Sequence, residues 1–384
     1  MVRENRKLTF CDFLLELHLQ VIQSKYLNLI LFYLIMEKNK KIHIDGRHGE
    51  GGGQILRTAL TLSSICQVPL YMNHIRGNRK KPGLRPQHLI AINSLATITK
   101  AKVQGATIDS HELIFEPGEI HKGNYSFHIG TAGSTGLVLQ AMIPVLLLGK
   151  ISSQIQITGG THVPWSPSFH YLKTVFLPAL KTMGGDVAVD IDKWGWYPKG
   201  GGTISAVIKN TKDLKAIHLS NRGKLRYLHI LSAVSNLPLS IAERQSSQSV
   251  KRLEYLGLKH TTSIENAPSS GQGTVLFLHA QFEGGGGGFT SLGKKGKRAE
   301  EIANEACDEC IKFLNSRGVI DIHLADQLVL YMALARGRST LITERITEHL
   351  LTNIWVIKQF LPSTFNIENE TGKIEVDGKG YKLN

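Results

Sequence analysis

A run of glycines flanked by an acidic and a basic residue is the first segment of this sequence that could bind phosphate. Residues 49–57 read GEGGGQILR. The glycines leave backbone N–H groups bare at the expected start of a helix, where unpaired donors and the helix dipole attract anions. Glu50 could bind a divalent cation, and Arg57, about two turns into the helix, could reach a phosphate. Glycine clusters also form tight turns that bind nothing, but the flanking charges favour a binding site.

A dense basic turn follows at residues 76–88, which read RGNRKKPGLRPQH. Arginine and lysine side chains bind phosphate oxygens, and arginine can do so with two parallel N–H donors. The alternative is a charged loop that is only solvated. Because proline and glycine shape this turn, we interpret it as a site for a nucleic-acid backbone or a terminal phosphate.

Two short motifs towards the C-terminus supply a carboxylate and a histidine. Residues 323–328 read HLADQL and residues 349–353 read HLLTN. Asp326 is a candidate metal ligand, and His349 is a candidate nucleophile because a neutral imidazole nitrogen can attack a phosphoryl group. The chain has 16 histidines, and most histidines are structural or exposed, so spacing alone does not single out His349.

Another segment looks like a nucleotide-binding P-loop. Residues 288–295 read GFTSLGKK between an expected strand and an expected helix. The eighth position of a P-loop needs a Ser or Thr hydroxyl for Mg²⁺, and here it is Lys295. We therefore do not expect this segment to bind ATP.

The composition is that of a large, basic protein. The 384 residues are 42% hydrophobic and 20% charged, which predicts two domains or one domain with an insertion. An excess of 45 Lys and Arg over 31 Asp and Glu gives a net charge of +14. This charge favours a polyanionic partner such as RNA, DNA or a nucleotide, because each neutralised phosphate releases counterions.

Cysteine usage predicts a reducing compartment, and we expect a cytoplasmic protein. The four cysteines are too few and too scattered for the disulfide framework of a small secreted domain. Cys307 and Cys310 form a CxxC within a helical pattern, without the second pair that would complete a zinc site. We interpret them as helix residues, with redox chemistry or metal binding as the alternative.

Residues 1–36 are expected to be an N-terminal extension. Residues 14–36 are apolar in blocks but are interrupted by polar and charged side chains, which is too broken for a membrane span of about 20 apolar residues. No small-residue cleavage site follows, so a secretory signal is not expected. One explanation is that translation begins at Met36. We expect no membrane partner.

From residue 42 onward, short β-branched runs alternate with helical patterns, which predicts helices layered on sheets. Three places share a strand, a turn of small residues and an apolar helix, at residues 49–59, 130–142 and, more weakly, 159–172. This recurrence indicates an internally repeated βαβαββ unit. The expected strands lie at 42–44, 70–75, 113–115, 125–129 and 151–158, and the expected helices at 54–65, 86–99 and 135–148.

A second, smaller domain is expected to interrupt these repeats. Composition changes after Gly200-Gly201-Gly202, and residues 217–318 have strands of their own at 227–235 and 274–282 and helices at 240–256 and 299–315. We predict a core domain made of residues 37–216 and 319–384, with residues 217–318 inserted. The glycine run at 284–288 is expected to be a flexible loop.

Taken together, these segments resemble one known family. The motifs GEGGGQILR, RGNRKKPGLRPQH, GTAGSTGLVLQ, WYPKGGG, HLADQL and HLLTN, in this order, are similar to those of RNA 3'-terminal phosphate cyclases. The resemblance runs from about residue 42 to residue 360. It implies an α/β core of repeated βαβαββ units and a smaller inserted α/β domain of thioredoxin-like topology.

The resemblance also implies an activity, that of an ATP-dependent ligase that forms a phosphoric ester bond. In this family's reaction, a histidine takes AMP from ATP and passes it to an RNA 3'-phosphate, giving an RNA(3')pp(5')A end. The adjacent 2'-OH then attacks, AMP leaves and a 2',3'-cyclic phosphate closes. ATP, Mg²⁺ or Mn²⁺ and an RNA with a 3'-phosphate end are the implied cosubstrate, metal and partner, and the oligomeric state stays open.

The resemblance assigns roles to individual residues. His349 would be the nucleophile, and Glu50 and Asp326 would bind the metal. Two positions differ from the family's usual residues, because His323 stands where a tyrosine is common and Val163 where an asparagine is common. The implied ATP contacts are Gln140, Pro164, His323, Leu324, Ala325, Asp326 and Gln327, with Pro164 and His323 on either side of the adenine. The implied contacts to the triphosphate or the RNA end are Arg57, Arg76, Arg79 and Gln87.

Two other functions are compatible with parts of this pattern. A cyclase-like protein that only binds RNA during its processing would share the fold, but relatives of that kind lack the nucleophilic histidine motif, which is intact at His349. An enolpyruvyl transferase shares repeated α/β units and basic phosphate-binding loops, but needs no covalent histidine.

Overall fold

The computed structural model describes residues 41–121, 123–149, 152–211 and 213–381. The expected N-terminal extension, Cys11 and the first residue of the strand expected at 151–158 lie outside these ranges. Within them, no helix has the length and apolar character needed to cross a bilayer.

The first repeated unit is a four-stranded sheet with two helices. Its strands run in the order β1-β2-β4-β3, with β1 and β2 parallel and the other two pairings antiparallel. The two helices expected in this region are confirmed, and α3 begins at a proline, which suits the first helical position. The elements are β1 (Ile42–Asp45), α2 (Gly53–Cys66), β2 (Leu70–Asn73), α3 (Pro86–Thr99), β3 (Lys102–Gln104) and β4 (Leu113–Glu116).

The second unit repeats this topology. Its sheet has the order β5-β6-β8-β7, again with a parallel first pair. Its second helix is built from three consecutive pieces, with a π-helical turn in the middle. The elements are β5 (Asn124–His128), α4 (Thr135–Leu147), β6 (Ser153–Gly159), α5 (Phe169–Tyr171), η1 (Leu172–Phe176), α6 (Leu177–Thr182), β7 (Asp186–Lys193) and β8 (Gly202–Lys209).

The third unit has the same strand order but is split along the chain. Its first strand is followed by a long intervening segment, residues 220–321, which we call the excursion. The other strands and both helices of the unit come after it. The sheet order β9-β14-β16-β15 matches the first two units, which confirms the repeated βαβαββ architecture. The elements are β9 (His218–Leu219), α9 (Ile322–Leu334), β14 (Arg336–Ile342), α10 (Glu348–Phe360), β15 (Thr364–Glu368) and β16 (Lys373–Lys379).

The three strand-turn-helix places do not each begin a separate unit. Residues 159–172 join β6 to the second helix of the second unit, so they do not begin a third unit. The true third counterpart begins with α9. Its first strand and first helix are about 100 residues apart in sequence because of the excursion between them, and this separation conceals the repeat.

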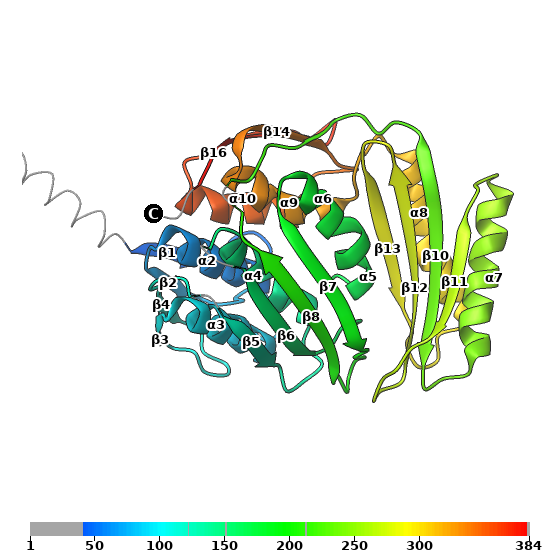
Figure 1. Cartoon of the computed structure of the whole chain (residues 1–384), viewed down its shortest axis with the longest axis horizontal. Helices are drawn as coiled ribbons and strands as arrows, with labels where there is room; N and C mark the ends of the chain where they lie inside the picture. The colour runs from blue at the N-terminus through cyan, green and yellow to red at the C-terminus, as the bar shows by residue number, and fades with distance from the viewer. Residues whose placement is uncertain (1–40, 122, 150–151, 212, 382–384) are drawn as a thin grey trace, which may run out of the picture.

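The excursion forms a separate sheet with two helices, which lies on the right in Figure 1. Its strand order is β11-β10-β12-β13, and α7 and α8 pack on the sheet and against each other. The predicted boundaries at 217 and 318 and the thioredoxin-like topology stay predictions. The elements are β10 (Leu225–Ser235), α7 (Leu239–Tyr255), β11 (Thr261–Asn266), β12 (Gly273–Phe282), β13 (Gly286–Leu292) and α8 (Ala299–Asn315).

Strand β12 joins this sheet to the rest of the protein. Its side chains alternate between two hydrophobic clusters, as the two faces of a strand require. Leu276 and Leu278 belong to the cluster that includes buried residues of α7 and α8, whereas Val275 and Phe277 belong to the main core. Both faces of the strand are therefore buried, and the sheet is fixed against the repeated units.

Residues 284 and 285 of the glycine run lie in the turn between β12 and β13, but residues 286–288 are strand, so the prediction of a flexible loop was wrong for them. Strand β13 begins at Gly286 and pairs in register with β12. A Cβ atom at Gly288 would lie 2.7 Å from the Tyr171 ring and 2.9 Å from the Phe277 ring, so this glycine permits close packing of the strand. The segment that looks like a P-loop lies largely on the same strand, as expected for one that does not wrap a phosphate.

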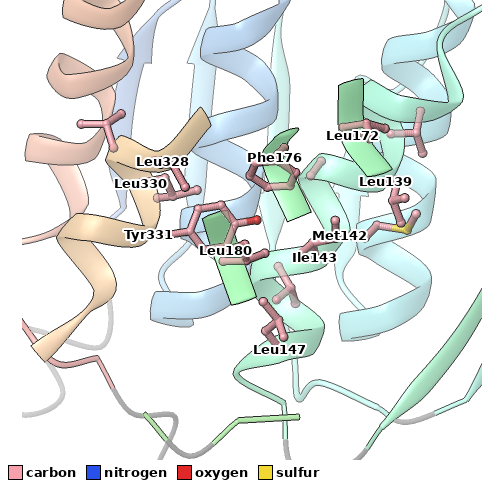
Figure 2. Close-up of a cluster of buried hydrophobic side chains, with 14 of the residues drawn as sticks. Leu139, Met142, Ile143, Leu147, Leu172, Phe176, Leu180, Leu328, Leu330 and Tyr331 are labelled. Carbon is pink, nitrogen blue, oxygen red and sulfur yellow. The ribbon is translucent and has the colours of Figure 1, made fainter. Parts of the chain in front are cut away.

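Helices of the second and third units meet within the main core. Figure 2 shows Met142 and Ile143 of α4, Phe176 of η1 and Tyr331 of α9 packed together, and the Phe176 and Tyr331 rings are 5.8 Å apart. Because α9 also begins at the candidate site, this packing fixes the position of the site relative to the second unit.

Replacing Phe176 with alanine should lower the free energy of unfolding by about 3–5 kcal/mol, because it removes a fully buried ring and leaves a cavity. Chemical denaturation of both proteins measures this difference. Val207→Ala, at an exposed position of β8, is the control and should change the value by less than about 1 kcal/mol. Equal losses in the two variants would contradict the packing in Figure 2.

Candidate active site

His349 lies between two carboxylates from distant parts of the chain. It is in the first turn of α10, whose N-cap Thr347 accepts a hydrogen bond from the backbone N–H of Leu350. The Nδ1 atom of His349 is 3.0 Å from Glu50 Oε2, and its Nε2 atom is 3.2 Å from Asp326 Oδ2. The glycine-rich segment and the two C-terminal motifs therefore meet at one imidazole ring.

Asp326, on α9, is fixed by amide side chains. Gln54 Nε2 of α2 donates to its Oδ1 atom at 2.7 Å, and Asn353 Nδ2 of α10 donates to its backbone carbonyl at 2.9 Å. Thr58 Oγ1 donates to Asn353 Oδ1 at 2.8 Å and completes the network. Three helices from two repeated units thus hold the carboxylate in one orientation.

The start of α9 is fixed by the buried carboxylate of Asp321. As the N-cap, it accepts hydrogen bonds from the backbone N–H groups of His323 at 2.7 Å and Leu324 at 2.9 Å. It also accepts from the Tyr171 hydroxyl at 2.9 Å and from the Gly288 N–H at 3.0 Å. Asp321 therefore joins the second unit, strand β13 and the helix that supplies His323 and Asp326.

Glu50 is positioned by the glycine-rich loop. Gly49 and Gly51 have φ values of +52° and +55°, the left-handed region that favours glycine. A Cβ atom at Gly49 would also collide with the Thr352 hydroxyl. The Glu50 carboxylate accepts from Arg79 Nη2 at 3.3 Å, so a residue of the basic turn reaches the loop.

Arg57 supplies a half-buried cation to the site. Burial lowers its pKa to about 10, and the charge of Asp326 partly opposes this, so the guanidinium stays positive at neutral pH. In the ranges that the structure covers, no carboxylate lies within ion-pair distance of it. Nearby His88 is neutral, because burial, together with the charge of Arg57, lowers its pKa to about 3. A cation in this setting can bind an anionic ligand.

The burial of His349 would lower the pKa of its imidazole, but the hydrogen bonds and charges of Asp326 and Glu50 outweigh this effect and raise it. Two carboxylates, one at each ring nitrogen, stabilise the doubly protonated ring. A nucleophilic nitrogen needs a free lone pair, so only the singly protonated form of the ring could attack an electrophile.

His349, both of its carboxylate partners and Arg57 line a cavity of about 730 Å³, within the range of small-molecule and cofactor sites. Two lining side chains, Gln54 and Gln327, have a buried Oε1 atom without a hydrogen-bond partner among the described residues. Buried polar atoms normally have partners, so these two are suited to a ligand. The cavity is lined by Glu50, Arg57, Gln140, His323, Asp326, Gln327 and His349, among other residues.

The other residues proposed from the resemblance do not line this cavity, and their roles stay predictions. Leu324 and Ala325 are buried in α9. Arg76 donates to the carbonyls of Lys81 and Gly83 and so shapes the basic turn. Gln87, Arg79 and Pro164 do not line the cavity either. Gln87 accepts from the Ser134 N–H, Arg79 pairs with Glu50, and Pro164 is exposed beside the lining residue Trp165.

Three side chains that the sequence did not single out also belong to this site. Gln54 and Asn353 orient Asp326. Gln54 lies in the motif GEGGGQILR and Asn353 in HLLTN, so membership of these motifs is a sequence signal that could identify both. Arg345 lines the cavity but lies in no such motif. Only the fold brings it to the site.

A divalent cation fits the site only in part. No three His, Cys, Asp or Glu side chains in the described ranges are arranged to hold a metal. Glu50 and Asp326 contact different nitrogens of His349 and do not converge on one point. A hard cation could still bind Glu50 together with phosphate oxygens of a ligand, which is how Mg²⁺ is usually held.

Comparison with known proteins identifies relatives over most of the chain. The family model described as RNA 3'-terminal phosphate cyclase matches residues 48–367. Curated proteins named RNA 3'-terminal phosphate cyclase include one from Pyrobaculum aerophilum, 40% identical over 88% of this chain and 99% of its own length. Others are from Staphylothermus marinus, at 42% identity over 88% and 98%, and Pyrococcus furiosus, at 39% identity over 88% and 100%.

A solved structure, that of the enolpyruvyl transferase NikO from Streptomyces tendae, also aligns. The match covers 89% of this chain and 49% of that chain, so this chain spans about half of its length. The identity is 10% and the TM-score is 0.37. A similarity this weak supports no conclusion about fold or function.

In the ligand-free and metal-free protein, the imidazole of His349 should titrate with a midpoint above 6.5, because both carboxylates favour its protonated form. Asp326→Asn removes one of these charges and should lower the midpoint. NMR titration of histidines labelled in the ring measures both values, and the signal missing in His349→Ala assigns the resonance. A midpoint below 6.5 in the unsubstituted protein would contradict the arrangement.

Proposed function

The chain belongs to the RNA 3'-terminal phosphate cyclase family, and on this basis we propose that it uses ATP to convert an RNA 3'-terminal phosphate into a 2',3'-cyclic phosphate. The observation that carries this proposal is the position of His349, which lies between Glu50 and Asp326 in a cavity that also contains Arg57. A nucleophile, two acidic groups and a half-buried cation suit nucleotidyl transfer.

In the first step, His349 attacks the α-phosphorus of ATP. A nitrogen–phosphorus bond forms, and the bond from the α-phosphorus to the bridging oxygen breaks as pyrophosphate leaves. The imidazole must first lose a proton from the nitrogen that attacks. The other nitrogen can then keep its proton and its carboxylate partner, which fixes the plane of the ring.

In the second step, an oxygen of the RNA 3'-phosphate attacks the phosphorus of the histidine-bound AMP. The nitrogen–phosphorus bond breaks, and the RNA ends in a 3',5'-diphosphate bridge to adenosine. In the third step, the adjacent 2'-OH loses its proton and attacks the terminal RNA phosphorus. AMP leaves, and the cyclic diester remains.

The reaction needs this activation because a phosphate monoester has no good leaving group. Adenylylation supplies one in AMP. Arg57, which lines the cavity, would bind the negative charge of the phosphate groups, and positioning of this kind provides most of the catalysis of phosphoryl transfer. Mg²⁺ or Mn²⁺, held by Glu50 and phosphate oxygens, would neutralise further charge.

No specific observation favours either alternative function. A protein that only binds RNA does not need a histidine held between two carboxylates, and the similarity to an enolpyruvyl transferase is too weak to support an argument. RNA with a 3'-phosphate remains the proposed partner. A cytoplasmic location is still a prediction.

An RNA oligonucleotide with a 3'-phosphate, incubated with ATP and Mg²⁺ or Mn²⁺, should acquire an end that resists phosphatase. Acid treatment should reopen it to a phosphatase-sensitive monoester. His349→Ala should slow this conversion by at least roughly 1,000-fold, because a covalent nucleophile is lost. His218→Ala, at an exposed histidine of β9 that does not line the cavity, is the control and should keep the rate. Full activity of His349→Ala would contradict the proposed role.

A further inference from the structure

Trp165 differs from the two buried tryptophans of the second unit. Its side chain is 98% exposed, whereas Trp194 and Trp196 are 4% and 3% exposed. Trp165 also lines the cavity that contains His349. A large aromatic ring left in water at the edge of a ligand cavity has apolar area available for a ligand.

The exposed ring stands on an ordered turn. Phe169 N–H donates to the carbonyl of Thr161 at 3.2 Å and closes the base of the turn, and Ser166 Oγ donates to the carbonyl of Val163 at 3.0 Å within it. Ser168 Oγ lies 3.2 Å from Thr290 Oγ1, which ties the turn to strand β13. The backbone therefore holds Trp165 at the rim.

The backbone conformation of Trp165 is itself unfavourable. Its φ value is +58°, in the left-handed region that bulky side chains rarely adopt. Strain and exposure occur together at the rim of the candidate active site, where such features often serve a ligand.

We propose that Trp165 stacks on the 3'-terminal nucleobase of the RNA, an inference that rests on the proposed function. Aromatic rings bind bases of single-stranded RNA in this way, with little dependence on sequence. The RNA end must reach His349 from outside, so its last base passes the rim of the cavity. ATP must also bring its α-phosphate to His349. The base of ATP has a place inside the cavity, where the buried Gln327 Oε1 atom lacks a hydrogen-bond partner within the described ranges.

The first test measures binding of a 3'-phosphorylated RNA by fluorescence anisotropy, which requires no turnover. Trp165→Ala should weaken binding by about 5- to 150-fold, the range for loss of one stacked base. Trp165→Phe should restore most of the affinity. The control is Tyr255→Ala on α7, because Tyr255 is 90% exposed but does not line the cavity. This variant should bind like the unsubstituted protein.

The second test uses an RNA of the same length whose terminal nucleotide has no base. The unsubstituted protein should bind it more weakly than the normal RNA by about the same factor as Trp165→Ala does. Trp165→Ala itself should bind the two RNAs equally. An unsubstituted protein that does not distinguish them, or a Trp165→Ala variant that still does, would overturn the proposal.

The third test measures the apparent affinity for ATP from the ATP dependence of self-adenylylation without RNA, and shows whether the ring binds the base of ATP instead of the base of RNA. If Trp165→Ala loses more ATP affinity than RNA affinity, the ring serves the base of ATP and the proposal is wrong. Unchanged binding of both ligands would also overturn it, and would leave the ring free for a protein partner. Because RNA binding is measured directly, lack of catalysis in the unsubstituted protein would contradict the proposed function and not the stacking.

Discussion

The candidate site depends on one interaction, the contact of the His349 imidazole with Glu50 at one nitrogen and Asp326 at the other. The two carboxylates raise the pKa of the ring against the effect of burial. They also hold the ring in a fixed plane at the wall of the cavity. In the proposed reaction, the contacts that orient His349 also favour its protonated form, so attack on ATP would require release of a proton and of one carboxylate.

The repeated architecture explains how these residues meet. Glu50 follows the first strand of the first unit, whereas Asp326 and His349 lie on the two helices of the third unit, so the site forms where two copies of one topology face each other. The excursion between β9 and α9 is connected to this site through Asp321, which accepts hydrogen bonds from Gly288 on β13 and from the first turn of α9. Packing on both faces of β12 keeps that sheet in place.

Five helices (α2, α3, α4, α7 and α8) and seven of the sixteen strands in the described ranges could be predicted, because they depend on local patterns. The third unit could not be recognised, since its first strand has two residues and lies far in sequence from its helix. The strand at 286–288 was missed because its glycines permit close approach, as Gly288 does to Tyr171 and Phe277, which no local pattern reveals. At the site, Glu50, Arg57 and Asp326 were identifiable by their chemistry, but His349 depended on the family resemblance, and Trp165 on its exposure in the fold.

The central claim is that His349 carries AMP during the reaction. The most direct measurement is to incubate the protein with ATP and a divalent cation, digest it, and locate the modified residue by tandem mass spectrometry. The account predicts AMP on the imidazole of His349 and unmodified peptides elsewhere. AMP on a lysine or on another histidine, or no adduct while the RNA is still cyclised, would contradict it.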